Sequence, residues 1–279
     1  MDTIGREHCL DDCAVFPCGK TNIVASTDMV HEKTDFPPGM TDRQIGWMSI
    51  AVTLSDIAAM GAAPSLVMLA VGLDRGSRLE AILHGAAECC KAYGTILAGG
   101  DLDAHDELTI VSSGIGFADH PVRRSGSRPG DRLCITGIPG RSQAALAGYH
   151  RYDRYLYEPR PQVNEGIYLA ETGVTSMMDN SDGLIISLYD MLEANPGCGY
   201  MVESSALPTL EDVSPDKGKE FSLYGGGDFN LIFTCSPEID LGNTIDYHVI
   251  GSVIRDARVL VDGRAAEMRG YQHIWVEEE

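Results

Sequence analysis

The chain alternates between short apolar runs, which are typical of strands, and longer segments in which apolar residues recur at helical spacing. In the first half we expect strands at 21–30, 66–73, 95–101 and 107–118, and helices at 41–60 and 78–93. A Pro-, Gly-, Ser- and Arg-rich segment, 120–132, reads as a connector between domains. A strand, a glycine turn and a helix then occupy 132–149, followed by helices at 163–172 and 183–194 and strands at 231–235 and 247–254. This order predicts an α/β (α+β) fold, and the chain length favours two domains, 1–122 and 123–279.

The helix at 41–60 contains an acid in apolar surroundings. Thr41 and Gln44 have the spacing of a capping box, and Gly61 and Pro64 end the segment. Apolar residues occupy nearly every side of this helix, and Asp56 lies among them near its end. An ionised carboxylate in such a place is costly unless it is paired, hydrogen-bonded or bound to a metal ion. Asp56 therefore needs a partner.

The charge balance excludes some kinds of partner. Acidic residues outnumber basic ones by 41 to 21, which disfavours general affinity for nucleic acid or anionic membranes. No apolar run approaches the length of a membrane span, and the amino terminus lacks the features of a signal peptide.

The eight cysteines form no CxxC pair. Reduced thiols in a cytoplasmic protein are the expected state.

Several acids share a position, because each lies where an element gives way to a turn or to small residues. Carboxylates at element ends can converge in one cleft, and such oxygen ligands suit Mg²⁺. A single acid at such a place is usually a cap or turn residue, so the expectation rests on the whole set. The set comprises Asp11, Asp12, Asp28, Asp101, Asp179, Asp182 and Asp228.

Neither a Walker A sequence nor a GxGxxG fingerprint is present, so another feature must bind any phosphate. In LAGGD, the backbone N–H groups near Gly100 could approach a phosphate beside Asp101. Arg123 and Arg124 could contact phosphate oxygens, or could only neutralise nearby acids. Gly140 precedes a helix, where it could help to place an anion or form a simple turn.

Together these residues resemble the thiamine-monophosphate kinases, a family in the superfamily of aminoimidazole ribonucleotide synthetase. The resemblance implies the two-domain fold of that superfamily, with an amino-terminal α/β domain that dimerises through its strands and a carboxy-terminal α+β domain that closes over ATP. The stretches that carry it run in family order over nearly the whole chain: DDCAVF, VASTDM, TLSDIAAMGAAP, LAGGD, RRSGSRPGD, TGIPG, EPRP, NSDGL, GGGDFNLIFT and GYQHI.

The resemblance also implies roles for individual residues. Those expected to hold Mg²⁺ are Asp12, Ser26, Thr27, Asp28, Asp56, Asp101, Asp179 and Asp182, with Asp11 as a lesser candidate. Those expected to contact ATP are Gly100, Asp101, Arg124 and Ser181, and those expected to be catalytic are Asp28, Asp56, Asp101 and Asp182. Three positions on the substrate side differ from the family pattern of histidine, glutamate and tryptophan, and they are Asp35, Gly227 and Tyr271.

The activity implied is direct transfer of the γ-phosphoryl group of ATP to thiamine monophosphate, which gives thiamine diphosphate. Mg²⁺ flanked by carboxylates would screen the repulsion between the two anionic substrates, so no side-chain nucleophile is needed. Two alternatives stay open. One is a ligase-like enzyme of the same superfamily that activates an amide or formyl oxygen, and the other is a nucleotide-binding homodimer without catalysis.

Overall fold

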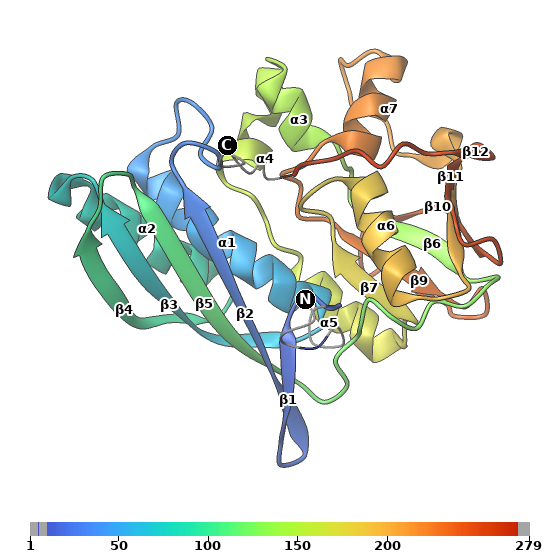
Figure 1. Cartoon of the computed structure of the whole chain (residues 1–279), viewed down its shortest axis with the longest axis horizontal. Coiled ribbons are helices and arrows are strands. Elements are labelled where there is room, and N and C mark those ends of the chain that lie inside the picture. Colours follow the sequence, from blue (N-terminus) through green and yellow to red (C-terminus); the bar gives the residue numbers. More distant parts are fainter. Residues whose placement is uncertain (1–4, 6–9, 273–279) are drawn as a thin grey trace, which may run out of the picture.

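The computed structural model describes residues 5 and 10–272, which form two β-sheets with helices packed against them (Figure 1). The first sheet has the strand order β1-β2-β5-β3-β4, in which only β3 and β4 run parallel. Its strands are β1 (Ala14–Cys18), β2 (Thr21–His31), β3 (Ala63–Leu73), β4 (Ile96–Ala104) and β5 (Thr109–Ala118).

Helices α1 (Asp42–Ala59) and α2 (Leu79–Ala92) cover one face of this sheet (Figure 1). The expected capping box is present in α1, because the Thr41 hydroxyl accepts from the Gln44 N–H and the Gln44 side chain accepts from the Thr41 N–H. Strand residues alternate between the two faces, so Val24 and Val67 are buried under the helices. The opposite face, called here the open sheet face, carries the exposed apolar side chains of Phe16, Met29, Met68, Ile96 and Phe117.

The second sheet has the order β12-β11-β8-β10-β6-β9-β7. Its strands are β6 (Arg132–Thr136), β7 (Ser176–Asp179), β8 (Gly199–Val202), β9 (Leu231–Cys235), β10 (Tyr247–Ile254), β11 (Val259–Val261) and β12 (Arg264–Ala265). The remaining helices are α3 (Arg141–Leu146), α4 (Asp153–Tyr157), α5 (Val163–Thr172), α6 (Leu184–Ala194) and α7 (Pro215–Tyr224), with short 3₁₀ turns η2 (Gly76–Arg78), η3 (His150–Tyr152) and η4 (Ser204–Ala206).

Helix α1 joins the two halves of the molecule, because it packs against the first sheet and also against α5 and β7. The contact with α5 is close: a Cβ added at Gly166 would lie 2.1 Å from the Ala58 carbonyl oxygen. Leu169 of α5 and Phe233 of β9 belong to the same core as α1, whereas α6 packs on the other face of the second sheet in a separate core. Asp56, near the end of α1, is therefore held at the junction of the two sheets.

The mixed α/β fold predicted from the sequence is confirmed, and each element that the alternation predicted is present within a few residues. Strands β1, β7, β8, β11 and β12 and helices α4 and α7 were missed, because the strands and α4 have at most five residues each and α7 has a mostly polar sequence. The first sheet ends at Ala118 and the second begins at Arg132, and the domain boundary between 122 and 123 stays a prediction. Among the described helices, none combines the length and apolarity that crossing a membrane requires.

The contact between α1 and α2 predicts a sharp difference between two glycines. A Cβ added at Gly85 would lie 1.8 Å from the Arg43 carbonyl oxygen, whereas one added at Gly76 meets nothing within 4 Å. We expect Gly85→Ala to lower the free energy of unfolding by roughly 1–3 kcal/mol, the usual cost of overpacking, and Gly76→Ala to change it by less than about 0.5 kcal/mol. Urea unfolding of both variants measures this, and equal stabilities would contradict the packing described here.

Candidate functional site

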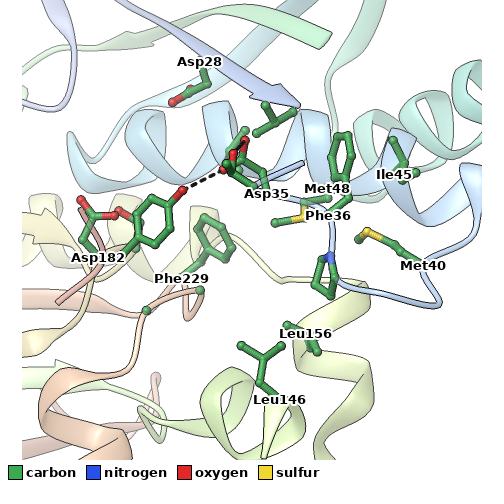
Figure 2. Close-up of a pocket in the computed structure, with 18 of the residues that line it drawn as sticks. Asp28, Asp35, Phe36, Met40, Ile45, Met48, Leu146, Leu156, Asp182 and Phe229 are labelled. Carbon is green, nitrogen blue, oxygen red and sulfur yellow. Dashed lines mark hydrogen bonds between the residues drawn. The ribbon is translucent and has the colours of Figure 1, made fainter. Parts of the chain in front are cut away.

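A pocket of about 1050 Å³ opens beside α1 and is lined by segments from both halves of the molecule. The loop that follows β2 forms one wall, and the segments after β7 and α7 form another. Figure 2 shows Asp28 and Asp182 on one side of this pocket, and Phe36, Met40 and Leu156 on the other. The pocket therefore has an acidic end and an apolar end.

At the acidic end, carboxylates from separate elements converge. Carboxylate oxygens of Asp12, Asp56 and Asp179 all lie within 4.8 Å of one another. Asp12 precedes β1, Asp56 is on α1 and Asp179 ends β7. Asp28 on β2 faces the same way and interacts electrostatically with Asp12 and Asp56. These four residues are called the acidic cluster below. Asp56 therefore lies among like charges, and its hydrogen-bond donor is the Ser26 hydroxyl.

Hydroxyl groups hold the carboxylates in place. The Ser26 Oγ donates to Asp56 Oδ2 at 2.5 Å, and Thr53 Oγ1 donates to Asp28 Oδ2 at 2.9 Å. Ser55 Oγ donates to Asp179 Oδ2 at 2.7 Å, which ties α1 of the first half to β7 of the second. These bonds fix the orientation of the acids but supply no positive charge.

Burial and mutual repulsion raise the pKa of three acids of the cluster, Asp28, Asp56 and Asp179. Desolvation is the main cause that raises the pKa of Asp56 well above its ordinary value, and the charges of Asp28, Asp179 and Asp12 add to it. Desolvation, followed by the charge of Asp12, raises the pKa of Asp179 to about 7. Desolvation also raises the pKa of Asp28. The ionised cluster is unfavourable unless a cation joins it.

Among the residues that the structure describes, one basic group, Arg124, reaches the cluster. Arg124 donates to Asp12 Oδ1 at 2.6 Å; burial favours its neutral form, but Asp12 outweighs that effect and the pKa of Arg124 is raised. Asn195 holds the connector, since its Oδ1 accepts from the Gly126 N–H and its Nδ2 donates to the Arg124 carbonyl. Asp12 Oδ2 is buried without a hydrogen-bond partner. Four carboxylates, one oxygen without a partner and a single arginine fit a divalent cation such as Mg²⁺.

Three residues that were predicted to bind Mg²⁺ or ATP lie away from the acidic cluster of their own chain. The Thr27 hydroxyl is on the open sheet face, where it hydrogen-bonds with Ser113 Oγ at 2.8 Å. Asp101 pairs with Ala70, an exposed position between the buried Leu69 and Val71, so it also lies on the open sheet face. Gly100 is its neighbour on β4, three strands from β2, which is roughly 14 Å at the usual strand spacing.

Two further acids have structural partners. Asp11 Oδ2 pairs with Arg123 at 2.6 Å, so Asp11 and this arginine neutralise each other beside the cluster. Asp228 accepts from the backbone N–H groups of Gly140 and Ser142, at 2.5 and 3.0 Å. The start of α3, where the sequence left room for a bound anion, is therefore occupied by a carboxylate of the chain itself. Asp228 therefore caps α3, the role that a single acid at such a position usually has, and it is not part of the acidic cluster.

The remaining predicted residues line the pocket. Ser181 and Asp182 follow Asp179, and Asp35, Gly227 and Tyr271 lie in the walls. The Tyr271 hydroxyl donates to Asp35 Oδ1 at 3.3 Å, which links the carboxy-terminal segment to the loop after β2. The roles assigned to these residues stay predictions. The sequence did not reveal the apolar end, which is lined by Phe36, Pro37, Met40, Ile45, Met48, Leu146, Leu156 and Phe229.

The sequence of the chain is similar to those of known proteins. Residues 10–118 match the family model for the amino-terminal domain of AIR synthase related proteins. A thiamine-monophosphate kinase from Methanospirillum hungatei is 48% identical over 97% of this chain and 95% of its own length. The chain belongs to the thiamine-monophosphate kinase family.

Other members of the thiamine-monophosphate kinase family support this placement. The relative from Halobacterium salinarum is 39% identical, over 94% of each chain. A solved structure described as AaThiL complexed with AMPPCP and TMP has a TM-score of 0.91 at 24% identity, and the match covers 98% of this chain and 94% of that one. At this identity the structural match shows a shared fold.

The raised pKa of Asp179 predicts how Mg²⁺ stabilises the protein at different pH. Without metal, the folded state holds a proton that the unfolded state releases, so stability falls as pH rises from the ordinary value of 3.8 towards about 7. Because Mg²⁺ competes with protons, the increase in Tm that it causes should be larger at pH 8 than at pH 5.5. Thermal unfolding with Mg²⁺ or EDTA at both pH values measures this. An increase that does not grow with pH would contradict a metal site at these carboxylates.

Proposed function

We propose that the protein is a thiamine-monophosphate kinase, which transfers the γ-phosphoryl group of ATP to thiamine monophosphate in a Mg²⁺-dependent reaction. The observation that carries this proposal is the acidic cluster at one end of a pocket large enough for an organic phosphate. The relative that is 48% identical is a thiamine-monophosphate kinase, and the match covers 95% of its length. Family membership and site chemistry therefore support the same reaction.

The site suits a reaction that depends on positioning and charge. The phosphate of the acceptor is already ionised near neutral pH and can attack without a general base, and among the pocket residues none forms a Ser-His-Asp arrangement. We propose that Asp12, Asp28, Asp56 and Asp179, with Asp182, hold Mg²⁺, which supplies the positive charge that screens the two sets of phosphates. Ser26 and Ser55 keep two of these carboxylates in place, and Arg124 provides a fixed positive charge next to Asp12.

A direct assay tests the reaction. We expect purified protein with ATP, thiamine monophosphate and Mg²⁺ to produce thiamine diphosphate and ADP, as measured by chromatography and mass spectrometry. Asp56→Asn removes one charge at constant size and keeps an acceptor for Ser26, so the fold should be retained while kcat falls at least about a hundredfold. Glu171→Gln, at an exposed position of α5, is the matched control and should retain full activity. Full activity of Asp56→Asn would contradict the site.

The open sheet face supports a homodimer. Five large apolar side chains on this face are 40–63% exposed: Phe16, Met29, Met68, Ile96 and Phe117. Contiguous exposed apolar residues are typical of an interface. Asp101, which the family resemblance assigns to ATP and Mg²⁺, lies on this same face, and Gly100 is its neighbour on β4. We propose that two copies pair through it, and that Gly100 and Asp101 of one copy serve the acidic cluster of the other.

Complementation between two inactive variants tests this arrangement. If Asp101 acts in the partner's site, a mixed dimer of Asp56→Asn and Asp101→Asn contains one site with both acids intact. Random mixing after unfolding and refolding should then restore about one quarter of the wild-type activity, because half of the dimers are mixed. If Asp101 acts within its own chain, both sites of the mixed dimer are damaged and the activity stays at that of the variants. Light scattering of each sample verifies the dimer.

A cytoplasmic location is also part of the proposal. Seven cysteines lie in the part of the chain that the structure describes, and all seven are free thiols. Six of them are buried, and only Cys18 is exposed. Free thiols of this number are typical of a reducing compartment. The eighth, Cys9, lies outside the described residues.

A further inference from the structure

The pocket presents three kinds of chemistry in a fixed order. The acidic cluster lies at one end and the apolar side chains lie at the other, with Asp35 between them (Figure 2). Asp35 follows β2 in the loop that forms the pocket wall, and its side chain is 14% exposed. A carboxylate in this middle position meets whatever part of a ligand joins its phosphate to its apolar group.

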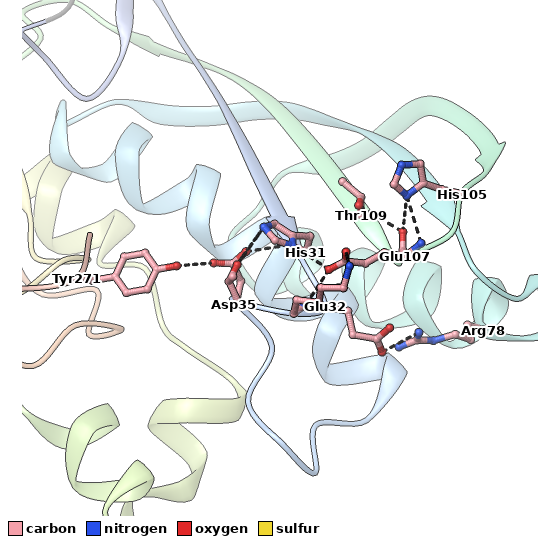
Figure 3. Close-up of polar contacts among 10 residues, drawn as sticks. His31, Glu32, Asp35, Arg78, His105, Glu107, Thr109 and Tyr271 are labelled. Atoms are coloured by element: carbon pink, nitrogen blue, oxygen red, sulfur yellow. Dashed lines mark hydrogen bonds and ion pairs between the residues drawn. The ribbon is translucent and has the colours of Figure 1, made fainter. Parts of the chain in front are cut away.

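Three hydrogen bonds hold the Asp35 carboxylate in position. Its Oδ2 accepts from the His31 backbone N–H at 2.9 Å and from Thr34 Oγ1 at 2.9 Å. Its Oδ1 accepts from the Tyr271 hydroxyl at 3.3 Å, across the pocket (Figure 3). All three donors are neutral groups of the backbone or of hydroxyls. They orient the carboxylate without cancelling its charge.

The nearby cations have other partners. Lys33 Nζ lies 2.6 Å from Glu107, and Arg78 pairs with Glu32, Asp42 and Asp74 at 2.8–3.0 Å. The His31 ring is closer to Glu107, at 2.9 Å, than to Asp35, at 3.9 Å (Figure 3). Among the described residues, no lysine or arginine lies within ion-pair distance of Asp35. A partly buried acid in this position is favourably matched by a cation on the ligand.

We propose that Asp35 selects a positively charged acceptor, by pairing with the cationic thiazolium ring of thiamine monophosphate. This inference rests on the proposed function. With the acceptor's phosphate at the acidic cluster and its aminopyrimidine ring among Phe36, Met40 and Leu156, the thiazolium ring lies at the level of Asp35. The order phosphate, cation, aromatic ring in the acceptor matches the order acidic cluster, Asp35, apolar end in the pocket.

Two acceptors that differ in charge test the proposal. In the thiophene analogue of thiamine monophosphate, a carbon replaces the positive ring nitrogen and the ring is neutral. Calorimetry with Mg²⁺ and a non-hydrolysable ATP analogue should show that the wild-type protein binds thiamine monophosphate about tenfold more tightly than this analogue, as expected for one charge-assisted contact. The preference should disappear in Asp35→Asn, whose side chain still accepts the bonds from His31 and Thr34.

Glu32→Gln is the matched control. Glu32 also lines the pocket, but its carboxylate pairs with Arg78, so loss of its charge should leave the preference unchanged. Loss of the preference in both variants would indicate that the overall negative charge of the pocket sets the preference. That result would overturn the assignment to Asp35. A preference that persists in Asp35→Asn would overturn it as well.

The experiment also separates this inference from the proposed function. If the wild-type protein forms thiamine diphosphate yet binds both acceptors equally, only the role of Asp35 fails. If it binds neither acceptor and forms no product, the kinase assignment fails together with the role of Asp35. The wild-type ratio of affinities needs no variant, so the proposal stays testable even where Asp35→Asn does not fold.

Discussion

Repulsion among Asp12, Asp28, Asp56 and Asp179 is the constraint around which the site is built. Desolvation and like charge raise the pKa of the last three, and hydroxyl donors fix the carboxylates without neutralising them. The packing of α1 against both sheets holds these groups together against that repulsion. The free energy stored in this way is returned when a cation binds, so affinity for metal and stability of the fold are linked.

The alternation of side chains along β2 divides the predicted ligands between two faces of one sheet. Ser26 and Asp28 face α1, whereas Thr27 between them faces outwards. Asp101 lies on the outer face with Thr27, and the same face carries exposed apolar side chains. A single chain cannot bring Asp101 to Asp28, because the sheet separates them. The proposed pairing of two open sheet faces would cover the exposed apolar side chains and would place Thr27 and Asp101 of both copies at one interface.

Local signals in the sequence predicted most elements, the capping box of α1 and the need of Asp56 for a partner. The outward position of Thr27 was not predicted, because the resemblance placed it with the metal ligands; strand alternation accounts for it. Other features depend on contacts that no local pattern contains. Asp228 caps α3 across 86 residues of chain, and the apolar end combines residues from several distant segments. Such contacts are fixed by tertiary packing, which spacing in the sequence does not encode.

Two of the three departures from the family pattern on the expected substrate side, Asp35 and Tyr271, are in direct contact. Gly227 has a φ of +84°, a conformation that side chains rarely adopt, so this loop cannot present the glutamate of the family pattern without strain. The chain has an acid at Asp35 instead, where the family pattern has a histidine, and Tyr271 donates to it. One negative charge is lost at 227 and one is present at 35, so the substrate side keeps its acidic character. The negative charge at Asp35 compensates for the one that is absent at Gly227. This compensation argues for a working acceptor site and against a homologue that has lost catalysis.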